Sequence, residues 1–380
     1  MLSCLKKPLI VGALLAAAAS GLPGVATAAP GRVPVDLGTL PGDQFSTVSA
    51  INATGTMVGE SYPQDVRLRY HPVKWDRQGR ISALPTLGGE QGRALAVNDA
   101  GVAVGWAFDG TEGVHAVRWA PDGSVTALPW AGTSEATVIS RTGVVAGGGS
   151  SPEGTYVALR WSPDGSVTRL AALPGGGQTV VTGITGDGAL ISGEAWDAAG
   201  NQHAVRWTAT GAITDLSPGN QGNPGATAAA INDFGVIAGT VTEAGWPAPV
   251  AWKRDGGRVR LDWPAAPASA TPRAINRAGV VVGSGYVDFA ESRAVRWSAG
   301  GVTVLEPARR SEAVAINATG TIVGNVESVA ARWAADGTET ILGALPGGQY
   351  SWATGIGPDG TVIGRSDLSY GWHAVYWPAS

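Results

Sequence analysis

Short apolar runs alternate with turn-forming residues along most of the chain. The clearest example lies between residues 94 and 128, where four such runs follow one another. They occupy residues 94–97, 102–105, 115–119 and 124–128, and segments rich in Asn, Asp, Pro and Gly separate them. Runs of this length, bounded by turn residues and lacking a helical period, predict four short β-strands.

The same four-strand unit recurs eight times. Each copy carries one tryptophan in its third run, and consecutive tryptophans lie 36 to 46 residues apart. These anchors are Trp75, Trp119, Trp161, Trp207, Trp252, Trp297, Trp333 and Trp377. A glycine closes the second run of each copy, at Gly59, Gly105, Gly147, Gly193, Gly239, Gly283, Gly324 and Gly364. Repeats of this length are typical of propeller blades, so we predict an all-β fold, a single eight-bladed β-propeller of four-stranded blades.

Three features of the repeat predict how the blades are held together. The motif Asn-x-x-Gly, as in residues 98–101, predicts a tight turn in which the Asn side chain bonds nearby backbone. The indole of the third strand is expected to fill the wedge between adjacent blades. The basic residue that precedes most of these tryptophans, such as Arg118, is expected to stack on aromatic surface or to bond turn carbonyls.

The two ends of the chain predict how the ring closes. The last copy stops at Ser380, just after Trp377, and therefore lacks a fourth strand. Residues 32–37 form a β-rich run before the first full copy begins. We expect this run to be the outer strand of the last blade, because that pairing removes a free sheet edge.

The first 28 residues resemble a secretory signal peptide, with Lys6 and Lys7 ahead of an apolar segment, residues 9–19, that is too short to span a bilayer. We therefore expect a cleaved leader, residues 1–28, a secreted propeller of residues 29–380, and no stable membrane insertion. An uncleaved anchor is the alternative, and it is disfavoured because no second long apolar run follows. Cleavage removes Cys4, the only cysteine, which leaves no thiol for disulfides, metal binding or nucleophilic catalysis.

The charge of the mature chain argues against nucleic acid as a partner. The formal net charge of −4 becomes −6 once the two lysines of the leader are removed. Binding to DNA or RNA requires a basic patch that neutralises phosphates, and a mildly acidic surface does not supply one.

The repeat also resembles a known family. Its consensus reads Ala-Ile-Asn-x-x-Gly-x-Val-Val-Gly, then His-Ala-Val-Arg-Trp, then Leu-Gly-x-Leu-Pro-Gly-Gly, and the matching segments are residues 274–283, 115–119, 203–207 and 342–348. On these motifs nearly the whole mature chain resembles the extracellular HAF repeat family. The resemblance implies a secreted bacterial repeat protein with a propeller-like fold, and it implies no particular activity. Val157, Ala248, Arg293 and Val329 replace the motif histidine, which argues against any role that needs this histidine in every copy.

The four histidines all lie four residues before a repeat tryptophan, at His71, His115, His203 and His373. Residues placed by repeat register are expected to form hydrogen bonds at blade edges and not to act as metal ligands or as a catalytic base. The sequence contains no HExxH motif and no Ser-His-Asp order. We therefore predict no metal site, no cofactor and no serine nucleophile.

The candidate binding residues lie in the loops that follow the second and fourth strands, because function concentrates on variable loops over a rigid scaffold. The candidates are Glu60, Tyr62, Trp106, Phe108, Asp109, Trp196, Asp197, Trp246, Tyr286, Asp288, Tyr370 and Trp372. Aromatic rings beside carboxylates are suited to carbohydrate or peptide ligands. The alternative is that these rings only cover the tops of the blades.

Two functions fit these residues. The first is a monomeric binding or scaffold module for an extracellular polymer, a glycan or cell-wall material in the first place and a protein otherwise. The second is a glycan hydrolase or lyase that uses carboxylates at the mouth of the propeller, with Glu60 and Glu194 as the best acids. Because these two glutamates lie three blades apart, we favour binding over catalysis.

Overall fold

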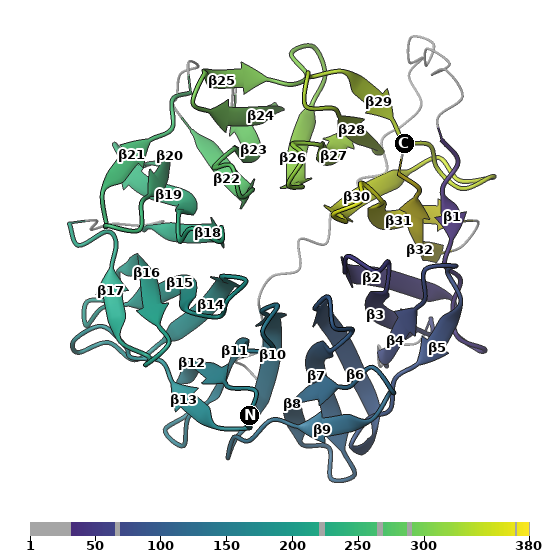
Figure 1. Ribbon diagram of the computed structural model, residues 1–380, viewed down its shortest axis with the longest axis horizontal. Coiled ribbons are helices and arrows are strands. Elements are labelled where there is room, and N and C mark those ends of the chain that lie inside the picture. Colours follow the sequence, from purple (N-terminus) through teal and green to yellow (C-terminus); the bar gives the residue numbers. More distant parts are fainter. Residues whose placement is uncertain are drawn as a thin grey trace, which may run out of the picture.

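A computed structural model describes residues 32–64, 69–219, 225–263, 269–286, 291–368 and 371–379, and the predicted signal peptide lies outside these ranges. The described residues form eight four-stranded antiparallel sheets and no helix. The sheets are arranged as blades around a central axis (Figure 1). This arrangement confirms the predicted eight-bladed β-propeller. Nothing in the described ranges forms a helix able to cross a membrane.

Each of the first four blades is a meander of consecutive strands, with the earliest strand nearest the axis (Figure 1). Blade 1 contains β2 (Phe45–Ile51), β3 (Met57–Tyr62), β4 (His71–Trp75) and β5 (Ile81–Ala83). Blade 2 contains β6 (Gly88–Val97), β7 (Ala103–Asp109), β8 (Val114–Trp119) and β9 (Val125–Ala127). Blade 3 contains β10 (Ser134–Ile139), β11 (Val145–Ser150), β12 (Tyr156–Trp161) and β13 (Val167–Arg169). Blade 4 contains β14 (Thr179–Ile184), β15 (Leu190–Trp196), β16 (Gln202–Thr208) and β17 (Ile213–Asp215).

The next three blades repeat this order. Blade 5 contains β18 (Thr227–Ile231), β19 (Ile237–Glu243), β20 (Trp246–Trp252) and β21 (Arg258–Arg260). Blade 6 contains β22 (Ala270–Ile275), β23 (Val281–Tyr286), β24 (Ser292–Ser298) and β25 (Gly301–Val304). Blade 7 contains β26 (Ser311–Ile316), β27 (Ile322–Val326), β28 (Val329–Trp333) and β29 (Glu339–Ile341).

Blade 8 joins the two ends of the chain. It contains β30 (Ser351–Ile356), β31 (Val362–Leu368) and β32 (Gly371–Trp377), with β1 (Val35–Asp36) as its outer strand. The predicted closure is therefore present, although the strand is shorter than the predicted run of residues 32–37. Val35 pairs with Tyr376, and the Leu37 amide extends the contact by donating to the carbonyl of Ala374. Pro34 precedes the strand and lacks the N–H that further pairing would need.

The repeated glycine is required by a β-bulge. In all eight blades the pairing between the first and second strands shifts register, and the anchor glycine pairs with the residue just before that shift. A Cβ atom at Gly239 would lie 1.9 Å from the carbonyl oxygen of Thr227, and the other seven anchors show the same approach. The bulge thus brings backbone to a distance that only glycine accommodates.

The repeated tryptophans occupy the wedges between blades, as predicted. Trp207 is fully buried in a cluster that joins Leu170 of blade 3 to Ile191 of blade 4. Its indole N–H donates to the carbonyl of Ala171, just past the outer strand of the preceding blade, at 2.7 Å. Equivalent bonds across a blade boundary are made by Trp75, Trp119, Trp161, Trp297 and Trp377. Trp252 and Trp333 are equally buried, and their indole nitrogens have no acceptor among the described residues.

The tight turns also join one blade to the next. The Asn52 side chain accepts the amides of Thr54 and Thr56 in its own turn and donates to the carbonyl of Asn98 in the next blade, at 2.9 Å. Asn98, Asn232 and Asn276 make the same forward bond. The basic position before the tryptophan bonds turn carbonyls of the following blade, at Lys74, Arg118, Arg206 and Arg296. Both sets of side chains therefore have structural roles, as the repeat pattern predicted.

We expect Gly239→Ala to destabilise the protein strongly, because the new methyl group must displace the backbone carbonyl of Thr227. The free energy of unfolding in urea should fall by about 3 kcal/mol. Gly110→Ala is the matched control, since a Cβ atom there meets no other atom within 4 Å. Equal losses in the two variants would show that the bulge does not require glycine.

The contribution of the indole hydrogen bond to stability can be measured by comparing two of the buried tryptophans, Trp207 and Trp252. Trp207→Phe and Trp252→Phe remove the same atoms from fully buried sites, but only Trp207 has an acceptor for its N–H. We expect Trp207→Phe to lower the free energy of unfolding by about 1 kcal/mol more than Trp252→Phe. Urea unfolding of both variants measures this difference, and equal losses would mean that the bond contributes nothing net.

Candidate binding site on the loop-side rim

The candidate site lies where the second strand of each blade ends. The residue after each anchor glycine pairs laterally with a residue of the innermost strand, so the two side chains lie on the same face of the blade. Glu60 pairs with Thr47, Trp106 with Arg93, and Arg365 with Trp352. We call this end of the ring, which carries the loops after the second and fourth strands, the loop-side rim.

In blades 1 and 2 this rim contains a buried ion pair. Glu60 is only 2 % exposed, and its Oε1 lies 2.5 Å from the guanidinium of Arg93. Burial raises the pKa of Glu60, and the charge and hydrogen bond of Arg93 offset this effect only in part. The Arg93 guanidinium also lies over the ring of Tyr70, 4.9 Å from its centroid. Glu60 therefore ties blade 1 to blade 2 and is not a free acid.

In blade 8 the rim carries a guanidinium over two indoles. Arg365 lies 4.9 Å from the ring centroid of Trp372 and 5.5 Å from that of Trp352. The two indoles meet edge to face at 5.2 Å, and Tyr350 lies 6.3 Å from Trp352. Arg365 keeps an exposed surface, although the partial burial of its guanidinium lowers its pKa.

A second group of aromatic rings lies on blade 1 at its boundary with blade 8. Phe45 stacks on Tyr62 with centroids 5.2 Å apart, and Tyr62 meets Tyr70 at 5.3 Å. On the blade 8 side, a Cβ atom at Gly371 would lie 3.2 Å from the Phe45 ring, so this glycine lets the two blades approach closely. We call the two groups together the aromatic arc; it consists of Tyr350, Trp352, Trp372, Phe45, Tyr62 and Tyr70, together with Arg365 and Arg93.

Several predicted residues lie in or beside the arc. Tyr62 and Trp372 belong to it, and Glu60 supports it through Arg93. Trp106 lies next to Arg93 in the β6–β7 pair and meets Phe108 at 5.7 Å, which extends the apolar surface into blade 2.

Asp109 and Asp197 stabilise their own loops. Asp109 accepts the amides of Thr111 and Gly113 and contacts His115 at 2.8 Å, and these bonds, led by that from Gly113, lower its pKa. Asp197 accepts the amides of Ala199 and Asn201, and hydrogen bonds from Asn201 contribute most to its lowered pKa. Both carboxylates are therefore already occupied by groups of their own blade.

The remaining predicted residues lie outside the arc. Trp196 ends β15 in blade 4, Trp246 begins β20 in blade 5 and is 40 % exposed, and Tyr286 ends β23 in blade 6. Asp288 and Tyr370 fall outside the described residues. Glu194 pairs with Val180 in blade 4, whereas Glu60 lies in blade 1, so the two candidate acids occupy blades that are not neighbours.

Each histidine contacts aspartate at a blade edge. His71 lies 2.8 Å from Asp43, and His373 lies 3.0 Å from Asp36. The buried His203 lies between two carboxylates, 3.1 Å from Asp215 and 3.5 Å from Asp197. Within the described ranges, no group of three or more His, Cys, Asp or Glu residues is placed to hold a metal ion.

The residues that sequence reasoning missed are Phe45, Arg93, Tyr350 and Trp352. All four lie in or just before innermost strands, whereas the prediction considered the residues and loops that follow the anchor glycine. The register of the first hairpin could have identified two of them. Counting residues along both strands from the Asn-x-x-Gly turn places Trp352 opposite Arg365 and Arg93 opposite Trp106, the residues that follow the anchor glycines.

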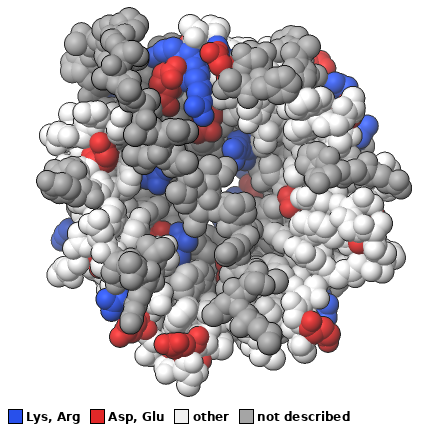
Figure 2. Space-filling view, turned by 180° about the vertical axis from the view of Figure 1, so that it is seen from behind, with Lys and Arg blue, Asp and Glu red and all other residues white. Residues whose placement is uncertain are grey.

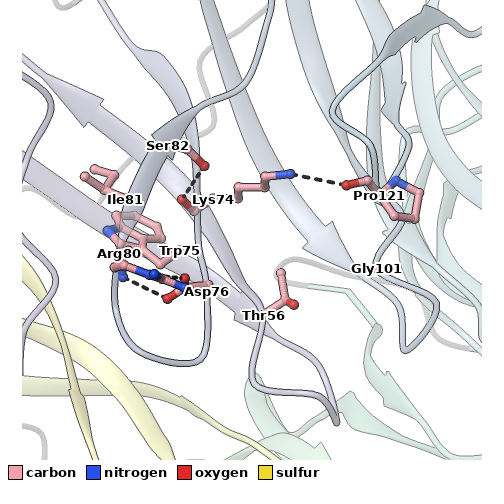
Figure 3. Close-up of a pocket in the computed structure, with 9 residues that line it drawn as sticks. All are labelled: Thr56, Lys74, Trp75, Asp76, Arg80, Ile81, Ser82, Gly101 and Pro121. Carbon is pink, nitrogen blue, oxygen red and sulfur yellow. Dashed lines mark hydrogen bonds and ion pairs between the residues drawn. The ribbon is translucent and has the colours of Figure 1, made fainter.

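Two shallow pockets lie away from this rim, between blades near the tight turns. One has a volume of about 350 Å³ and lies between blades 1 and 2 (Figure 3). Within it, Lys74 reaches the Pro121 carbonyl at 3.3 Å, and Arg80 pairs with Asp76. The other, about 340 Å³, lies at the equivalent boundary between blades 8 and 1. Because such boundaries repeat around the ring, we regard these pockets as products of the blade geometry.

Acidic and basic side chains are interspersed on the face of the propeller that is turned away from the viewer in Figure 1. Figure 2 shows acidic and basic side chains scattered over this face, and neither sign covers it continuously.

Comparison with known proteins identifies no function for this chain. No protein-family model matches the sequence, and no curated protein matches it either. Among solved structures, TolB from Acinetobacter baumannii is 12% identical over 75% of this chain and 79% of its own, with a TM-score of 0.42. Virginiamycin B lyase from Staphylococcus aureus is 12% identical over 81% of this chain and 97% of its own, with a TM-score of 0.42.

A Mycobacterium tuberculosis puromycin-hydrolysing peptidase is 11% identical, with a TM-score of 0.49, over 89% of this chain and 61% of its own. At identities this low the likeness concerns the fold alone, and it transfers no activity to this chain.

The closing strand should loosen in acid through Asp36. Burial opposes ionisation of this carboxyl, but hydrogen bonds from His373 and the Gly38 amide outweigh it and lower its pKa below 3.8. Because the pKa of Asp36 is lower in the folded protein than in the unfolded chain, its ionisation stabilises the fold at any pH above the unfolded pKa. This contribution is lost as the pH falls through the folded pKa. Asp36→Asn should therefore be less stable than the wild type at pH 6, and the difference should shrink as the pH falls below 3.8.

Urea unfolding at pH 6, 4 and 2 measures this dependence. Glu90→Gln serves as the control, because Glu90 forms only an exposed pair with Arg69 and should change stability little at any pH. A difference for Asp36→Asn that persists unchanged at pH 2 would show that ionisation of Asp36 is not the cause.

Proposed function

We propose that this protein is a secreted binding module that holds an extracellular glycan on its aromatic arc. The observation that carries the proposal is the presence of two groups of partly exposed rings on the adjoining blades 8 and 1, with guanidinium groups among them. Flat apolar faces combined with directional donors are the features by which proteins bind sugar rings. The leader-like N-terminus and the resemblance to extracellular HAF repeats support a location outside the cell.

The arc is also rigid, which favours binding. Four of its six rings, those of Phe45, Tyr62, Trp352 and Trp372, stand on strands of the propeller and contact neighbouring rings, so little conformational freedom is lost when a ligand is bound. A row of rings spread over adjacent blades suits a repeating polymer better than a single small molecule, because successive units can contact successive rings.

The alternative of a hydrolase or lyase has less support. Glycosidases use two carboxyl groups about 5 to 10 Å apart on either side of the scissile bond. Glu60 is buried against Arg93, and Glu194 belongs to a blade that is not its neighbour. The two candidate acids therefore do not form the close pair that hydrolysis would require.

The test is depletion of residues 29–380 from solution by insoluble polysaccharides and bacterial cell walls, with new reducing ends assayed in the same tubes. We expect depletion without new ends. Trp352→Ala and Trp106→Ala should each weaken binding about tenfold, because each removes a ring face from the arc or its extension. Tyr350→Ala is a milder variant, since Tyr350 is 44 % exposed and should tolerate truncation.

Phe234→Ala is the matched control. Phe234 is 54 % exposed and lies in a tight Asn-x-x-Gly turn, on the face opposite the long loops. Its removal should leave binding unchanged. If arc variants and the control bind equally, the arc is not the site; new reducing ends would favour the hydrolase instead, and binding only to a cell-wall protein would replace the glycan as ligand.

A further inference from the structure

The charged groups of the loop-side rim differ in whether the protein itself supplies an ion-pair or hydrogen-bond partner. Glu60 is paired with Arg93, Glu135 accepts a hydrogen bond from the Tyr156 hydroxyl at 2.8 Å, and Glu312 accepts one from Asn325 at 3.0 Å. Arg365 occupies the same register position as Glu60 and Asn325. Within the described part of the chain it forms no hydrogen bond and no ion pair, and only ring contacts hold it.

Those ring contacts orient the guanidinium. The faces of Trp352 and Trp372 attract its positive charge and restrict its plane, but they use none of its five N–H donors. The side chain is therefore positioned in advance, exposed to solvent, and has its hydrogen-bonding capacity available. A guanidinium held in this way matches the two oxygens of a carboxylate or phosphate in a bidentate geometry.

The surroundings favour an anion that is attached to a sugar ring. Trp352 and Tyr350 continue the aromatic surface on one side of Arg365. An acidic group on the ligand would thus meet Arg365 while its ring packs against the neighbouring aromatic faces.

We propose that Arg365 is a subsite for the acidic group of an anionic glycan, and that the polymer bound by the arc carries carboxylates or phosphates. This inference rests on the proposed glycan-binding function and specifies the ligand class. Arg93, at the opposite end of the arc, cannot play the same part because Glu60 already neutralises it. The structure therefore places one anion-binding position in the described part of the arc.

The experiment compares matched polymers and matched variants by titration calorimetry. The probes are polygalacturonate, its methyl ester, and a glycerol-phosphate teichoic acid. We expect the wild type to bind at least one acidic polymer about tenfold more tightly than the neutral ester, and Arg365→Gln to abolish this preference. Arg365→Lys should keep part of it, because lysine retains the charge and loses the fork.

Arg273→Gln is the control, since Arg273 is an exposed arginine of the innermost strand of blade 6 and its loss changes the net charge equally. It should keep the full preference for acidic polymers. Preference for polygalacturonate alone would identify carboxylate as the ligand group, and preference for teichoic acid alone would identify phosphate.

Two results would overturn the inference. The first is equal binding of the acidic and neutral polymers by the wild type, which would leave glycan binding intact and remove the anionic subsite. The second is a preference that survives in folded Arg365→Gln. If the wild type bound none of the three polymers, and no insoluble polysaccharide or cell wall, the proposed function itself would fail and the subsite with it.

Discussion

The ring depends on the indole wedge between adjacent blades. A four-stranded blade cannot bury both of its faces alone, and the buried tryptophan fills the widening gap between its own blade and the preceding one. In six of the eight blades its N–H also reaches a carbonyl just past the outer strand of that preceding blade. Apolar packing and a directional bond are thus supplied by one side chain, which fixes both the spacing and the rotation of each blade.

The bulge in the first hairpin adds a second constraint, and it reaches the candidate site. Because the anchor glycine admits a backbone carbonyl at close range, the residue after it is presented beside the innermost strand. Every blade therefore offers one lateral pair of side chains at the loop-side rim. The repeat holds the geometry of these pairs constant, and their chemistry is free to differ from blade to blade.

The parts of the fold that follow from the repeat could be predicted, since each reflects a local rule copied eight times. The wedge of Trp119, the turn at Asn98 and the carbonyl contact of Arg118 are examples. The site could be predicted only in part, because it depends on which residues of different copies become neighbours. Trp352 and Phe45 are far apart in sequence, and they join one arc only because the closing strand brings blade 8 against blade 1. Loop composition identified Tyr62 and Trp372, but it also selected Asp109 and Asp197, whose carboxylates serve their own turns.

The charged residues of the rim differ between blades, and this difference bears on whether the rim only covers the blades or also binds a ligand. If the rim served only to cover the blades, each of its charged groups would be expected to have an ion-pair or hydrogen-bond partner within the protein, as Glu60, Glu135 and Glu312 do. Among the described residues Arg365 has only ring contacts, and a guanidinium with no carboxylate partner gains little folding stability from its charge. Its fixed orientation has value chiefly when an external acceptor arrives, since the entropy of positioning the group has already been lost on folding. The joint between the first and last blades thus closes the ring and also brings together the surface that we propose as the binding site.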